Sequence, residues 1–97
     1  MKPSPNGAFP EATPIRDARP RIRGRFAGRV GRIRIQSQAS VGTLELKLTD
    51  GTGSLTALFM GRREIPGVDC GSSLVIEGTP VVQERGLVLY NPAYELA

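Results

Sequence analysis

Arginine side chains are concentrated in one short stretch of this 97-residue chain. Eight arginines lie between Arg16 and Arg34, and Asp17 is the one acidic residue among them. A guanidinium group carries a planar fork of N–H donors that matches phosphate and carboxylate oxygens, and it stays charged at any physiological pH. The chemistry that these residues could perform is therefore the binding of an anion.

The arginines alternate with apolar residues as in a half-buried β-strand. In residues 21–30 the cations occupy odd positions and the larger apolar residues even ones, whereas in residues 32–35 this phase is reversed. One extra residue would restore a single apolar face, and Gly31 is the expected site of such a β-bulge. A long, bent first strand of this kind suits a small closed barrel.

With the bulge, the strand has one apolar and one basic face. The apolar face is expected to carry Ile22, Phe26, Val30, Ile33 and Ile35. The opposite face is expected to carry Arg21, Arg23, Arg25, Arg29, Arg32 and Arg34.

The net charge of +4 is unevenly divided along the chain. Residues 1–48 carry ten Lys and Arg against three Asp and Glu, and residues 49–97 carry three against six. Arginines that outnumber the acids able to neutralise them point to a polyanionic partner. The alternative is that the charged face serves only solubility and that the arginine content reflects a coding bias.

The composition excludes several classes of function. Cys70 is the single cysteine and there is no histidine, so a monomer can form neither a disulfide framework nor a His/Cys metal site. No nucleophile–base pair is visible, and we expect no enzymatic activity, cofactor or metal. No apolar run approaches the about 20 residues that span a bilayer, and no secretory signal is visible, so we expect a cytoplasmic protein without membrane association.

Turn signals divide the chain into a tail and one all-β domain. Five of the eight prolines fall in residues 1–20, which we expect to form a disordered tail, followed by a domain over residues 21–97. After the bulged strand, further strands are expected at 43–49, at 54–60, at 73–79 continuing to Val82 past a bend at Pro80, and at 87–90. A hairpin turn is expected at 50–53. The absence of a long helical pattern favours a β-sandwich or barrel.

Several motifs occur in an order that resembles stand-alone OB-fold nucleic-acid-binding domains. They are the bulged basic strand, Leu48–Leu55, Ile65–Gly67, Gly71, Ile76–Gly78 and Asn91–Glu95. The likeness covers about residues 21–96 and is greatest to the DNA-binding wedge domain of the RecG helicase and to the anticodon-binding OB-folds of some tRNA synthetases. It implies a five-stranded Greek-key barrel whose ligand face lies on the second and third strands, here 43–49 and 54–60, flanked by loops 36–42 and 83–86.

The basic strand and this resemblance together predict non-enzymatic binding of single-stranded DNA, junction DNA or RNA. Phosphate contacts would dominate, so we expect little sequence preference. Phe59 and Tyr90 are the candidates for stacking on bases, although aromatic residues in such strands are more often part of the core. The expected binding residues are Arg23, Arg25, Arg29, Arg32, Arg34, Lys47, Phe59, Arg62, Arg63 and Arg85.

A protein-interaction module is the alternative function. OB barrels also dock peptides and partner subunits, and a Pro-rich tail could anchor a protein partner. In that case the arginines would face an acidic protein surface.

Overall fold

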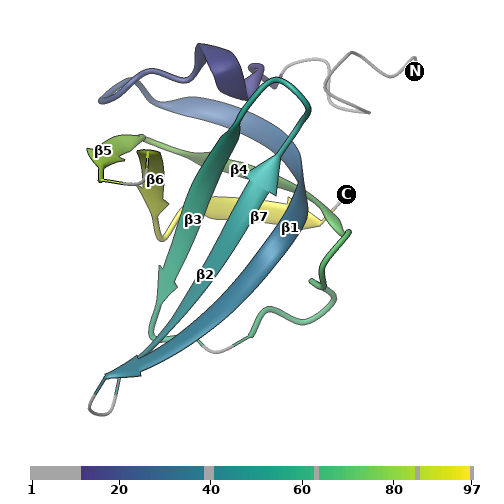
Figure 1. Cartoon of the computed structure of the whole chain (residues 1–97), viewed down its shortest axis with the longest axis vertical. Coiled ribbons are helices and arrows are strands. Elements are labelled where there is room, and N and C mark those ends of the chain that lie inside the picture. The colour runs from purple at the N-terminus through teal and green to yellow at the C-terminus, as the bar shows by residue number, and fades with distance from the viewer. Residues whose placement is uncertain (1–11, 39–40, 63, 85, 97) are drawn as a thin grey trace.

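The computed structural model describes residues 12–38, 41–62, 64–84 and 86–96. Within them the chain forms β-strands and one short 3-10 helix, so the predicted all-β class is confirmed (Figure 1). The elements are η1 Ile15–Asp17, β1 Gly24–Gln38, β2 Val41–Thr49, β3 Ser54–Met60, β4 Ser73–Gly78, β5 Val81–Gln83, β6 Gly86–Tyr90 and β7 Ala93–Leu96.

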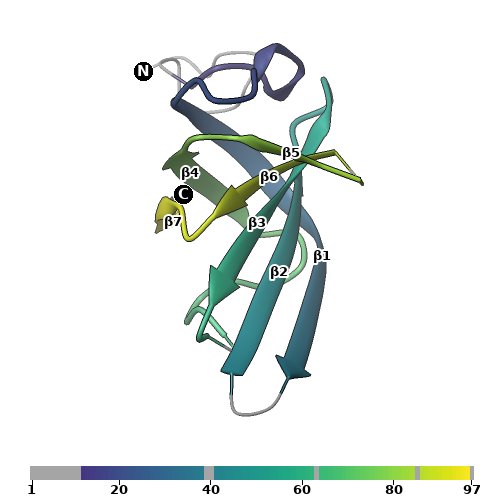
Figure 2. The ribbon, with the colours of Figure 1, turned by 90° about the vertical axis from the view of Figure 1, so that its left-hand side faces the viewer.

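The strands form one mixed sheet in the order β5-β6-β3-β2-β1-β4-β7. All neighbouring strands are antiparallel except β3 and β6, which are parallel. Between the described residues no ladder joins β5 to β4 or β7, so the sheet is not closed into a barrel. Figures 1 and 2 show β1, β2 and β3 extending together well beyond the region where β4 and β7 lie.

The sheet therefore differs from the expected closed barrel of five strands. The fourth expected strand is divided at Thr79 and Pro80, because proline cannot donate a ladder hydrogen bond. Its first part, β4, pairs with β1, and its second part, β5, pairs with β6. The last expected strand, 87–90, is β6 and ends at Tyr90, but an additional strand, β7, follows it and pairs with β4.

The β-bulge predicted at Gly31 is confirmed. Val30 pairs with Leu48 and Arg32 with Lys47, so Gly31 is the additional residue of β1. A Cβ at Gly31 would meet nothing closer than the Lys47 carbonyl oxygen at 4.0 Å. The crowded glycines of β1 are instead Gly24, whose Cβ would lie 2.6 Å from the ring of Phe26, and Gly28, whose Cβ would lie 3.0 Å from a backbone oxygen of the neighbouring strand.

The inward faces of the strands form one core. Of the five apolar residues expected there from the first strand, Phe26 and Val30 are buried and Ile33 packs partly against the cluster. Ile22 and Ile35 are 59% and 56% exposed, and their expected burial is wrong. Ile22 precedes β1, and Ile35 lies beyond the last residue of β1 that pairs with β4.

Residues 12–20, expected as part of the tail, pack against the sheet. Ile15 is only 4% exposed and belongs to the core, and Ala12 packs against Ala27 and Val75 on the other face of β1 and β4. The backbone N–H of Thr13 donates to the carbonyl oxygen of Arg25 over 2.7 Å. The rest of the expected tail, residues 1–11, lies outside the described residues.

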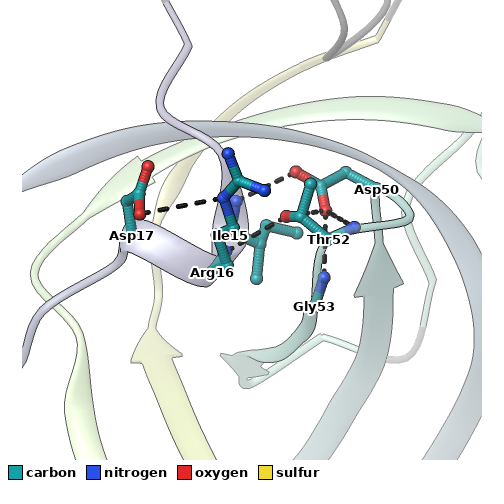
Figure 3. Close-up of polar contacts among 6 residues, drawn as sticks. All are labelled: Ile15, Arg16, Asp17, Asp50, Thr52 and Gly53. Carbon is teal, nitrogen blue, oxygen red and sulfur yellow. Dashed lines mark hydrogen bonds and ion pairs between the residues drawn. The ribbon is translucent and has the colours of Figure 1, made fainter.

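The carboxylate of Asp50, in the turn after β2, holds this segment in place (Figure 3). Its Oδ2 accepts a hydrogen bond from the backbone N–H of Ile15 at 2.9 Å. Its Oδ1 accepts from the hydroxyl and N–H of Thr52, at 2.6 and 2.8 Å, and from the N–H of Gly53 at 3.3 Å. Thr52 in turn accepts from the N–H of Arg16 at 3.1 Å. One turn therefore ties η1 to the β2–β3 hairpin.

These contacts lower the pKa of Asp50. Partial burial disfavours the charged carboxylate and acts to raise the pKa, but hydrogen bonds from Thr52, Ile15 and Gly53 outweigh it and hold the pKa below its ordinary value of 3.8. Because the pKa of Asp50 is lower in the folded protein than in the unfolded chain, its carboxylate contributes its full stabilisation of the fold at pH values above the unfolded-state pKa. This stabilisation is lost as the pH falls through the folded pKa.

The variant Asp50→Asn should lower the free energy of unfolding at neutral pH by about 1–2 kcal/mol, after allowance for partial exposure, because the amide has one acceptor and no charge. Urea unfolding at neutral and acid pH measures this difference, which should shrink in acid as the wild-type carboxylate becomes protonated. Asp17→Asn is the matched control and should change the stability little. The Asp17 side chain is 55% exposed, and its ion pair with Arg16 is both exposed and long, at 3.9 Å. Equal stability of Asp50→Asn and the wild type at neutral pH would contradict this role.

Candidate functional site

Strand β1 distributes its arginines over two parts of the sheet. Arg25 lies opposite Glu77 of β4, whereas Arg32 lies opposite Lys47 of β2. Arg29 is at the crossing, paired with β2 on one side and with β4 on the other. The outward face of β1 is thus shared between an acidic and a basic neighbour.

Arg23, which directly precedes β1, and Arg25 are neutralised by carboxylates. Arg25 donates from Nη1 to Glu77 Oε1 at 3.3 Å and from Nη2 to Glu95 Oε1 at 2.9 Å. Arg23 donates from Nε to Glu77 Oε2, and its Nη2 is also 3.2 Å from that oxygen. The expectation that the arginines share one basic face without acidic partners is therefore wrong for Arg23 and Arg25. Their ion pairs join the start of β1 to β4 and β7.

The second group remains together on the outward side of β1 and β2. We call it the basic face and define it as Arg29, Arg32, Arg34 and Lys47. Arg32 and Lys47 are exposed and directly opposite each other, an arrangement of like charges that destabilises a sheet. In the described ranges, no carboxylate lies within ion-pairing distance of Arg29, Arg32 or Lys47.

The neighbours of the basic face on β2 and β3 carry hydroxyl groups. Lys47 lies opposite Thr56 of β3, and Thr49 lies opposite Ser54 in the same ladder. Arg34, which is half-buried, differs because Glu45 of β2 lies directly opposite it. The cationic part most suited to an external anion is therefore centred on Arg32 and Lys47, with hydroxyl donors beside it.

A shallow hollow of about 300 Å³ adjoins the basic face on β3 and β6. Parallel pairing of these strands sets Tyr90 opposite Leu58. Tyr90 is 44% exposed, and its hydroxyl accepts a hydrogen bond from Gln83 Nε2 at 3.0 Å. Thr56 lines this hollow and also lies directly opposite Lys47, so the hollow and the basic face are contiguous. The hollow is lined by Glu45, Thr56, Leu58, Gln83, Glu84, Val88 and Tyr90.

Phe59 is not available for stacking. It is 3% exposed, because the alternation of β3 turns it into the core, and its ring packs edge-to-face on Tyr94 with centroids 5.6 Å apart. The expectation of Phe59 as a surface platform is therefore wrong. Of the two stacking candidates, Tyr90 is the exposed one.

Of the remaining expected cations, the structure describes Arg62, which does not extend the basic face. Arg62 is exposed, but its Nη1 lies 3.1 Å from the hydroxyl of Tyr94 and its guanidinium carbon 5.6 Å from the centre of that ring. This contact joins Arg62 to β7, an end strand of the sheet. Arg63 and Arg85 lie outside the described residues.

Cys70 is exposed and forms no disulfide. In the part of the chain that the structure describes, no group of three or more His, Cys, Asp and Glu residues is placed to hold a metal ion. None of the described helices has the length and apolar character needed to cross a membrane. No protein-family model and no curated protein matches the sequence.

Removal of one positive charge should raise the melting temperature when the charge lies on the basic face and lower it when the charge belongs to the ion-paired group of Arg23 and Arg25. Lys47→Gln removes repulsion across the ladder and should raise the melting temperature at low ionic strength by about 1–3 °C, a gain that concentrated salt abolishes. Arg25→Gln leaves Glu77 and Glu95 without their shared partner. It should lower the melting temperature by about 4–8 °C, which corresponds to roughly 1 kcal/mol of unfolding free energy. Thermal unfolding by circular dichroism at two salt concentrations makes the comparison, and a loss of stability in Lys47→Gln as large as that in Arg25→Gln would contradict it.

Proposed function

We propose that this protein binds nucleic acid, without catalysing a reaction on it, through the basic face. The observation that carries the proposal is the exposed pair Arg32 and Lys47, opposite each other with Arg29 beside them. Placing like charges in one ladder costs stability, and a bound polyanion would turn this repulsion into attraction. Arginine forks and neighbouring hydroxyl groups are the donors that most often contact the phosphates of nucleic acids.

We further propose that this sheet is an OB-fold. OB-folds are partly open, five-stranded Greek-key barrels that bind oligonucleotides on the face of their second and third strands. Support comes from the β1-β2-β3 meander, the second pairing of β1 with β4, and the derivation of β4 and β5 from one stretch of chain bent at Pro80. The face of β2 and β3 is also the one that carries Lys47, Thr56 and the hollow.

Single strands are the form of nucleic acid that this surface suits best. A tyrosine ring can stack on a base only when the base is unpaired and turned outward. Tyr90 offers an exposed ring in the hollow that adjoins the basic face. A nucleic-acid strand whose phosphates lie along the basic face could therefore place a base in this hollow. Phosphate contacts and stacking both tolerate any sequence, so the preference among sequences should be weak.

Binding should depend steeply on salt. If the four cations of the basic face each neutralise one phosphate, log K should fall with log salt at a slope of about −3, from roughly −0.7 per contact with a single strand. Fluorescence anisotropy with a labelled oligothymidylate at several salt concentrations measures the slope. Arg32→Gln should reduce the slope by about 0.7 and weaken binding.

Arg23→Gln is the matched control for this experiment. It removes the same charge from the residue just before β1, but that charge is neutralised by Glu77, so affinity and slope should stay close to the wild type. A flat salt response, or equal losses in Arg23→Gln and Arg32→Gln, would mean that the basic face is not the binding surface.

Tyr90→Leu tests the preference for single strands. Loss of one stacked base should cost about 1–3 kcal/mol with a single-stranded oligonucleotide, roughly a 5- to 150-fold loss of affinity, and little with the corresponding duplex. Tyr90→Phe keeps the ring but loses the hydrogen bond from Gln83, and should bind like the wild type. Competition between DNA and RNA strands identifies the preferred polymer. A loss in Tyr90→Leu that is equal for single strand and duplex would exclude stacking.

A further inference from the structure

Three large apolar side chains are exposed together where residues 19–22 meet β5. Ile22 is 59% exposed, Val81 41% and Val82 63%. With Pro20 and two arginines, Arg19 and Arg21, they line an open hollow of about 670 Å³, which we call the β5 hollow. A single exposed aliphatic residue is ordinary, but several around one depression are typical of an interaction site.

The fold holds both walls of the β5 hollow in place. β5 is an end strand, paired with β6 on one side. The backbone N–H of Arg21 donates to the carbonyl oxygen of Pro80 over 2.9 Å, which fixes residues 19–22 beside the start of β5, as Figure 1 shows. Arg21 adopts a φ of 69°, a left-handed conformation that is unfavourable for a residue with a side chain. Backbone strain of this kind is concentrated at functional sites.

The rim of the β5 hollow is cationic. Arg19 and Arg21 are exposed, and among the residues with described positions no carboxylate lies within ion-pairing distance of either guanidinium. The floor is aliphatic, from Ile22, Val81 and Val82. A ligand that complements both features must combine aliphatic groups with negative charge.

We propose that the β5 hollow docks an extended segment of a partner protein that carries aliphatic and acidic residues. Valine and isoleucine side chains suit aliphatic groups, whereas the described lining contains no aromatic ring on which a base could stack. Residues 1–11 of this chain carry Lys2 and Glu11, which cancel, so that segment lacks the required charge. The surface is small, and the complex should be weak and transient.

The test uses the full chain labelled with ¹⁵N and three synthetic octapeptides. The first alternates aspartate with valine, the second replaces each aspartate by lysine, and the third replaces each valine by serine. The aspartate–valine peptide should shift the amide signals of Ile22, Val81 and Val82. The other two peptides should bind at least about tenfold more weakly, because each lacks one of the two complementary features.

Variants locate the contact. Val82→Ser and Arg19→Gln change exposed side chains, so they should fold normally and weaken the first peptide about five- to tenfold. Ile35→Ser is the matched control, because Ile35 is 56% exposed on β1 away from the β5 hollow, and it should leave affinity unchanged. Lys47→Gln should weaken the oligothymidylate without affecting the peptide, so a failure of the proposed function is distinguishable from a failure at the β5 hollow.

Three results would overturn the assignment. The first is the absence of peptide-induced shifts at these amides. The second is a loss of oligothymidylate affinity in Val82→Ser as large as that in Lys47→Gln, since the β5 hollow would then belong to the nucleic-acid path. The third is a concentration-dependent dimer in sedimentation that Val82→Ser abolishes, since a second copy of the chain would then be the occupant.

Discussion

Strand β1 is hydrogen-bonded to β4 along its first half and to β2 along its second, and this double pairing depends on one extra residue at Gly31. Without a bulge, the strict alternation of side chains would turn the second half of the strand inside out. Val30 and Ile33 could then not face the same core, and Arg32 could not lie on the outward side with Arg29. The same residue therefore permits both the hydrophobic core and the basic face.

The crossing of β1 also decides which arginines are neutralised. Before the crossing, the outward neighbours are Glu77 and Glu95, and the guanidinium groups become part of an ion-pair network that holds β4 and β7 to β1. After the crossing, Arg29 lies opposite Thr49 and Arg32 opposite Lys47, which in turn lies opposite Thr56, and only Arg34 has an acidic residue, Glu45, opposite it. The two ends of this basic segment therefore have different physical roles. The ion pairs of Arg23 and Arg25 stabilise the fold, whereas the positive charges of Arg29 and Arg32 have no described carboxylate within ion-pairing distance.

Local patterns in the sequence predicted what depends on local geometry. The phase change between Val30 and Arg32 located the bulge, alternation identified β2 closely, and the apolar run after the hairpin turn identified β3. The long-range pairings were not accessible in this way. The charges of Glu77 and Glu95 are evident in the sequence, but only the registers of β4 and β7 place them against Arg23 and Arg25. Similarly, the exposure of Tyr90 and the burial of Phe59 follow from the parallel pairing of β3 and β6 and from the core that β3 faces. The packing of Ile15 under the β2–β3 turn had one possible signal, an isolated isoleucine in a Pro-rich stretch.

The most direct test of the division between the two arginine groups is the NMR spectrum of the arginine Nε–H groups during titration with a single-stranded oligonucleotide. The signals of Arg29 and Arg32 should move progressively as the strand is added, whereas those of Arg23 and Arg25 should stay in place because their hydrogen bonds to Glu77 and Glu95 persist. Equal movement of all four signals, or movement of Arg23 and Arg25 alone, would contradict this division.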